Sequence, residues 1–123
     1  WMEVHPDYPY RNTAAQRDDP ESLYNVYRKL IALRKEHQAL REGLYMPLTF
    51  EPKTLMAYLR QTKDEMLLVA INFGRKPVRL FLGSDLAGKN WNLLLSTRRE
   101  KLEQPEGNAI RLLGNEALVV DLG

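Results

Sequence analysis

The side chains that could perform acid–base chemistry are spread along the chain and stand mainly where caps and turns are expected. These carboxylates are Asp18, Asp19, Asp64, Glu65, Glu103 and Glu106. A carboxylate in a cap or a turn usually accepts hydrogen bonds from nearby backbone N–H groups, which is a structural task. No two of them form a credible acid/base pair, so we predict no catalytic residue in this chain.

Histidine, cysteine and serine lead to the same prediction. His5 and His37 lie far apart and lack the His-x-x-His or His-Glu-x-x-His spacing of a metal site. The chain has no cysteine, which excludes disulfides, thiol nucleophiles, thiolate zinc sites and iron–sulfur clusters. None of Ser22, Ser84 and Ser96 stands in a Gly-x-Ser-x-Gly elbow, and no phosphate-binding glycine loop occurs. We therefore expect no metal and no cofactor.

Two features of the sequence indicate an interaction partner, and the first is Arg34, whose guanidinium needs a hydrogen-bonding or ionic partner. On a helical wheel it lies near the centre of an apolar arc, where an unpaired guanidinium is costly. We expect its aliphatic stem to pack while its head reaches the helix end, backbone carbonyls or a buried acid. A ligand-binding role is the alternative interpretation.

The second feature is a cluster of aromatic and polar residues close to the first residue. It consists of Trp1, His5, Asp7, Tyr8, Tyr10 and Arg11. Such a mixture suits the stacking and hydrogen bonding of a sugar, but it is also typical of a strap that packs across a neighbouring surface. We favour the packing strap.

One helix must position Arg34. Asp19 as N-cap and Pro20 at the first helical position predict a helix from Pro20 to about His37, after an irregular lead-in over residues 1–18. Gly43 is expected to close the segment in a left-handed conformation. The predicted buried face consists of Leu23, Val26, Tyr27, Leu30, Ile31 and Leu33.

After Gly43 the hydrophobic period changes to two. Strands are predicted near 44–50, 54–61, 66–73, 77–82, 90–96, 109–113 and 117–122, separated by legible turns. The third of these is apolar on both sides and should be central, and Gly114-Asn115 is the best signal for a tight hairpin. The predicted fold class is mainly β, an antiparallel, Greek-key-like sandwich preceded by one long helix. We place the domain boundary between residues 1–43 and 44–123.

Composition limits the partners. The 123 residues suffice for one domain with an appended element, and a net charge of +2 gives no field that would attract nucleic acid or an anionic membrane. The longest apolar run, 66–71, is far shorter than the roughly 18 residues of a membrane span. The absence of an initiator methionine at Trp1 suggests the middle of a longer polypeptide, and the absence of cysteine leaves the compartment open, with the cytoplasm preferred.

Several strings together resemble one enzyme family. They are Trp1-Met2-Glu3-Val4-His5-Pro6-Asp7-Tyr8, Asn12, Ala15-Gln16, Asp19-Pro20-Glu21-Ser22-Leu23, Tyr27-Arg28-Lys29-Leu30-Ile31-Ala32-Leu33-Arg34-Lys35, Ala57-Tyr58-Leu59-Arg60, Leu67-Leu68-Val69-Ala70-Ile71-Asn72-Phe73 and Trp91-Asn92-Leu93-Leu94-Leu95-Ser96. The first part is similar to the last barrel helix of the alpha-amylase superfamily, glycoside hydrolase family 13, in its alpha-glucosidase, oligo-1,6-glucosidase and trehalose synthase branch. The later strings resemble the strands of that family's C-terminal β domain.

The resemblance implies a parent enzyme that retains configuration at an alpha-glucoside, with its carboxylates on loops of earlier barrel strands. None of those catalytic motifs occurs here, so the chain is expected to be inactive alone and to stabilise the catalytic barrel, its missing partner from the same polypeptide. The apolar helix face left bare should then make the chain self-associate.

Two other functions remain open at this point. The first is an accessory carbohydrate-binding module, for which Trp91 and Tyr58 are the candidate platform, although both are more readily explained as core residues. The second is a non-catalytic, glucosidase-like ectodomain of an amino-acid transporter heavy chain. The absence of cysteine and of a membrane span argues against the second.

Overall fold

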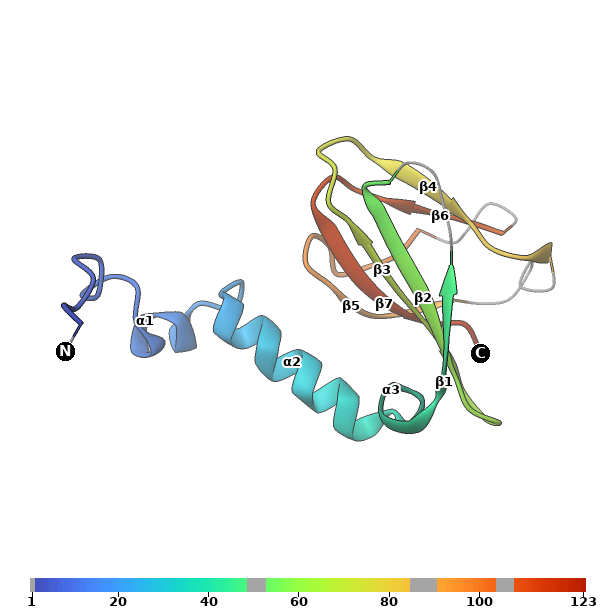
Figure 1. Ribbon diagram of the computed structural model, residues 1–123, viewed down its shortest axis with the longest axis horizontal. Helices are drawn as coiled ribbons and strands as arrows, with labels where there is room; N and C mark the ends of the chain where they lie inside the picture. The colour runs from blue at the N-terminus through green and yellow to red at the C-terminus, as the bar shows by residue number, and fades with distance from the viewer. Residues whose placement is uncertain (1, 49–52, 85–90, 104–107) are drawn as a thin grey trace.

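The computed structural model describes residues 2–48, 53–84, 91–103 and 108–123. Three helices form an arm that extends from the end of a β-rich body (Figure 1). The helices are α1 (Thr13–Asp18), α2 (Leu23–Glu36) and α3 (Gln38–Glu42). The strands are β1 (Leu44–Leu48), β2 (Leu55–Gln61), β3 (Met66–Asn72), β4 (Val78–Phe81), β5 (Asn92–Ser96), β6 (Ala109–Leu112) and β7 (Glu116–Asp121). Mainly antiparallel β structure is therefore confirmed.

The start of the main helix corrects the prediction. Helix α2 begins at Leu23, not at Pro20, because its N-cap is Ser22, whose side chain accepts a hydrogen bond from the backbone N–H of Asn25. Asp19 instead accepts from the backbone N–H of Glu21 and belongs to the turn before the helix. The lead-in is also not wholly irregular, since residues 13–18 form α1.

The expectation of one long helix is wrong as well. Helix α2 has 14 residues and is the only helix of seven or more among the described residues. His37 adopts an extended conformation, and a separate short helix, α3, follows it. Gly43 is extended rather than left-handed, with φ −60° and ψ 150°. It is required for space, because a Cβ there would lie 2.5 Å from the Ala39 carbonyl oxygen.

All seven predicted strands are present, with bounds that differ by one or two residues where the structure describes them. The predicted ends at 49–50 and 90 lie outside the described residues. Five strands form one antiparallel sheet in the order β1-β2-β3-β7-β5, so β3 is central as predicted. Strands β4 and β6 form a second, two-stranded antiparallel sheet.

The hairpin prediction at Gly114-Asn115 is wrong in its pairing. The turn exists, and Asn115 has a positive φ of 51°, but it joins β6 of the small sheet to β7 of the large sheet. A Cβ on Gly114 would meet the Arg75 carbonyl oxygen at 2.0 Å, so this turn packs tightly against the β3–β4 connection. A local turn signal therefore marked the place but not the partner strand.

The two sheets share one hydrophobic core. Fully buried side chains from the large sheet, such as Leu68 and Leu118, cluster with Leu80 and Ile110 of the small sheet. Trp91 belongs to the same cluster, which confirms that it is a core residue. No helix among the described residues is both long enough and apolar enough to cross a bilayer.

Candidate functional site

The most prominent candidate for a functional surface is an apolar face of α2 that nothing in the described chain covers. We call Leu23, Tyr27, Leu30 and Ile31 the α2 stripe, since their spacing of three and four residues places them on one face of the helix. The exposed fractions of Leu23, Tyr27 and Ile31 are 66%, 60% and 52%. The predicted buried face is therefore mostly open.

A small second core joins α2 to the large sheet. Leu33 is the one buried residue of α2 and packs against Leu95 of β5 and Val119 of β7. Leu40, Val69 and Leu94 surround this contact. The helix is consequently attached to the sheet near its C-terminal end, while the α2 stripe continues around the helix away from that contact.

A groove lies beside this attachment, between the helices and the outer face of the large sheet. The α2–sheet groove has a volume of about 430 Å³. It is lined by Leu30, Arg34, Leu40, Arg41, Tyr45, Tyr58, Arg60, Val69 and Val119. The rings of Tyr45 and Tyr58 stand 5.0 Å apart between centroids at an interplanar angle of 46°. Tyr58 is thus a groove residue rather than a residue of the main core.

Three arginines of this groove hold the junction of α2 and α3. Arg34 Nη1 donates to the Leu40 carbonyl at 2.8 Å, which is the kind of backbone partner expected for it. Arg41 Nη1 donates to the carbonyls of Arg34 and Lys35, and Arg60 Nε donates to the Ala39 carbonyl at 3.1 Å. Cationic side chains at the C-terminal end of a helix also oppose its negative dipole end.

Glu65 completes the junction from the β2–β3 turn. One carboxylate oxygen accepts from the backbone N–H of Ala39 at 2.9 Å, and the other lies 3.1 Å from His37 Nδ1. The Ala39 hydrogen bond lowers the pKa of Glu65 most; burial opposes this, while the His37 bond and the charges of His37 and Arg41 lower the pKa further. Helix α3 has no side-chain cap of its own, so Glu65 supplies one.

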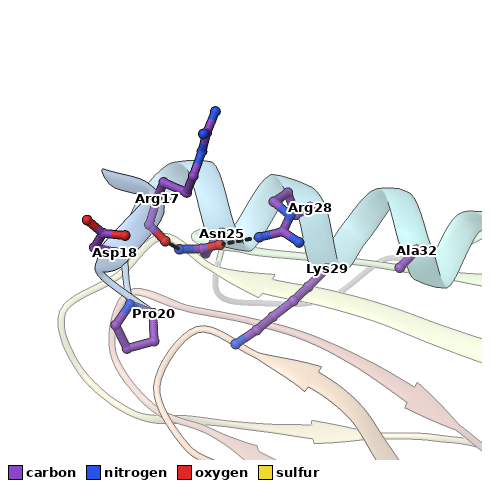
Figure 2. Close-up of a pocket in the computed structure, with 7 residues that line it drawn as sticks. All are labelled: Arg17, Asp18, Pro20, Asn25, Arg28, Lys29 and Ala32. Carbon is purple, nitrogen blue, oxygen red and sulfur yellow. Dashed lines mark hydrogen bonds between the residues drawn. The ribbon is translucent and has the colours of Figure 1, made fainter. Parts of the chain in front are cut away.

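A second pocket of about 450 Å³ lies where α1 meets α2 (Figure 2). Its lining residues are Arg17, Asp18, Pro20, Asn25, Arg28, Lys29 and Ala32. The Asn25 amide donates to the carbonyls of Gln16 and Asp19. It also donates to the Arg17 carbonyl, and Arg28 donates to the Asn25 side chain at 3.3 Å (Figure 2). These bonds tie the two helices together, which is a structural role.

The aromatic cluster near the first residue is only partly assembled. The backbone N–H of Asp7 donates to His5 Nδ1, and Arg11 lies 3.5 Å from the Asp7 carboxylate. Tyr8 and Tyr10 are exposed, the latter at 83%. Trp1 lies outside the described residues. Within residues 2–11, the structure therefore brings together the polar members but gives the rings no surface to pack on.

Among the described residues, no three histidine, aspartate or glutamate side chains gather as metal ligands would. Sequence analysis missed Glu116, which is fully buried and lies 2.9 Å from Arg99 Nε. It also accepts from Ser96 Oγ at 2.7 Å and from the Leu113 backbone N–H at 2.6 Å. A glutamate at the start of an otherwise apolar strand was its only signal, and its role is to tie β5 and β6 to β7.

Comparison with known proteins places these features in a family. Residues 1–43 match the family described as Alpha amylase, catalytic domain. The oligo-1,6-glucosidase of Parageobacillus thermoglucosidasius is 34% identical over 119 residues, which are 97% of this chain and 21% of the relative. The trehalose-6-phosphate hydrolase of Escherichia coli is 32% identical over 105 residues, 85% of this chain and 19% of the relative.

Solved structures agree with the sequence relatives. The isomaltulose synthase of Klebsiella sp. LX3 superimposes with a TM-score of 0.82 at 28% identity, over 98% of this chain and 21% of that protein. The trehalose-6-phosphate hydrolase of Bacillus licheniformis gives 0.79 at 30% identity, over 98% and 22%. The chain thus spans about a fifth of the length of these proteins. It belongs to the alpha-amylase family, glycoside hydrolase family 13, and is related to oligo-1,6-glucosidases, trehalose-6-phosphate hydrolases and isomaltulose synthases.

Proposed function

We propose that this chain is the C-terminal part of an enzyme that acts on alpha-glucosides, and that its task is to cover and stabilise the catalytic barrel. The observation that carries the proposal is the α2 stripe, an apolar helix face for which the described chain offers no cover. Burying apolar surface is the main source of stability in such contacts, at about 25 cal/mol per Å². A barrel helix that has lost its neighbours would leave such a surface.

The proposal assigns residues 1–43 to the barrel side and residues 44–123 to a C-terminal β domain. In support, the match to the catalytic-domain family ends at residue 43, and α3 ends one residue before that. The two sheets that share one core favour a sandwich with Greek-key-like connections for the second part. Barrel enzymes carry their catalytic groups on the βα loops of the barrel, which agrees with our prediction of no catalytic residue in this chain.

A chimera tests this function. The matching fifth of the P. thermoglucosidasius oligo-1,6-glucosidase is deleted or replaced by this chain, and thermal unfolding and turnover of a chromogenic alpha-glucoside are measured. We expect the deletion to lose stability and activity, the chimera to recover both, and this chain alone to show no turnover. Turnover by the chain alone, or a chimera no more stable than the deletion, contradicts the proposal.

The exposed α2 stripe also predicts how the isolated chain behaves in solution. With its apolar face bare, the isolated chain should self-associate, because water-exposed apolar patches drive association. Sedimentation of the chain and of an Ile31→Glu variant measures this. We expect the variant to sediment as a monomer at concentrations at which the unsubstituted chain does not; a monomeric unsubstituted chain at high concentration contradicts the docking role of the stripe.

A further inference from the structure

We propose that the α2–sheet groove seats a carboxylate-bearing segment of the catalytic barrel, held by Arg34, Arg41 and Arg60. This inference rests on the proposed function and names the chemistry of the partner at one place. The charge of the groove, its available hydrogen-bond donors, its apolar floor and its position between two parts of the chain all favour such a partner.

The charge of the groove has one sign. Its lining includes three arginines and no acidic residue. The ion pairs found among the described residues involve His5, Arg11, His37 and Arg99, but none of the three groove arginines. Glu65 interacts electrostatically with Arg41, but its carboxylate is already bound by Ala39 and His37. An anionic group entering the groove therefore meets attraction without competition.

The three guanidinium groups also have donors to spare. Each guanidinium carries five N–H donors. Within the described part of the chain, Arg34 and Arg41 bond backbone carbonyls through Nη1 only, and Arg60 bonds through Nε only. These bonds hold the arginines at the α2–α3 junction, so the heads are already positioned and the remaining N–H groups are available. Carboxylates bind such preplaced guanidinium groups through two parallel hydrogen bonds.

The floor of the groove favours a protein segment as the occupant. Val69, Val119 and Leu40 supply apolar surface, and the Tyr45–Tyr58 pair supplies rings that can be covered on their faces. Covering this floor removes water from the guanidinium groups and strengthens their attraction for a carboxylate. A segment with apolar residues flanking an aspartate or a glutamate matches both properties.

The position of the groove indicates where that segment comes from. One wall belongs to α2 and α3, within the residues that match the catalytic-domain family, and the other belongs to the β strands after residue 43. Leu30 lies both in the α2 stripe and in the groove, so the two surfaces are continuous. Relatives are about five times longer than the part that this chain matches. The segment that covers the stripe therefore extends into the groove.

The first test compares losses of stability in two settings. Arg34→Gln and Arg60→Gln are made both in the isolated chain and in the chimera described above, with Lys35→Gln as the matched control on the exposed side of α2. The isolated chain reports the bonds to the Leu40 and Ala39 carbonyls, which are present in both settings. We expect each arginine variant to lower the unfolding temperature of the chimera by about 3 °C more than that of the isolated chain. Equal losses in the two settings overturn the inference.

The second test identifies the partner group directly. Arg34→Lys and Arg60→Lys chimeras are treated with a carbodiimide, which joins an amine to a carboxylate only when the two are in contact, and the products are mapped by mass spectrometry. The expected product links Lys at position 34 or 60 to an aspartate or a glutamate of the barrel. A stable, active chimera without such a link overturns the inference alone. A chimera no more stable than the deletion overturns the proposed function and this inference with it.

Discussion

The helical arm and the β-rich body obtain their structure in different ways. Over residues 2–42 the buried side chains are Ser22, Leu33 and Ala39, whereas the strands bury most of their inward side chains in one core. The arm is ordered by capping and by hydrogen bonds at its two junctions, with one packed contact at Leu33. The difference shows that the body has its own core, whereas the arm leaves an apolar face, the α2 stripe, that the described chain does not cover.

Deleting core volume is the strongest way to test this comparison. Leu118 of β7 is 1% exposed and stands between the two sheets, so Leu118→Ala leaves a cavity that the surrounding side chains fill only in part. We expect it to lower the free energy of unfolding of the isolated chain by about 2–5 kcal/mol in chemical denaturation. Leu23→Ala, on the α2 stripe, is the matched control and should change that free energy by less than about 0.5 kcal/mol.

The chimera provides the second half of this test, because there the stability effect of Leu23→Ala should differ from its effect in the isolated chain. There, Leu23→Ala should become destabilising, because the proposed function places the barrel over the α2 stripe. If Leu23→Ala costs as much as Leu118→Ala in the isolated chain, the arm has a core of its own and the comparison fails.

The β-rich body was predicted almost completely because its signals are local. Alternating apolar residues and turn residues defined all seven strands, and the two-sided apolar pattern of the predicted strand 66–73 placed β3 at the centre. The hairpin at Gly114-Asn115 failed because a tight turn does not specify which sheet the next strand joins. Glu116 was missed because its partners, Arg99 and Ser96, lie in a different segment.

The start of α2 and the α2–sheet groove could not be predicted from local sequence signals. Asp19 and Ser22 are both good N-cap residues, and only the fold of α1 against α2 decides between them. The α2–sheet groove combines residues 34, 45, 60 and 119, which no spacing rule connects. Arg34 was recognised as needing a partner because its position in the apolar arc is itself a local signal.

Removal of the α2 cap is expected to have an intermediate effect confined to the arm. Ser22 Oγ accepts from the Asn25 backbone N–H and donates to the Gln16 carbonyl, so Ser22→Ala breaks both the cap and the α1–α2 junction. We expect a loss of about 1 kcal/mol of helix stability, seen as faster amide exchange in the first turn of α2 with unchanged exchange in β3. Asp19→Ala is the control, and a larger effect from Asp19→Ala would restore the start at Pro20.

The smallest expected effect concerns the junction of arm and body, where Glu65 caps α3. Its folded-state pKa lies below the ordinary value of 4.5, so its charged form stabilises the folded chain. That contribution is fully present above about pH 4.5 and is lost as the pH falls through the lowered pKa. The Glu65 side chain is 30% exposed, so its contribution is small. Glu65→Gln should therefore lower the free energy of unfolding by about 0.5 kcal/mol at pH 7, and by less at pH 3.

Denaturant unfolding at the two pH values measures this, with Asp64→Asn in the same turn as control. A gap between wild type and Glu65→Gln that is equal at both pH values would show that the charge of the carboxylate does not join the arm to the body. The packing of Leu33 and the Arg60–Ala39 hydrogen bond would then hold the junction.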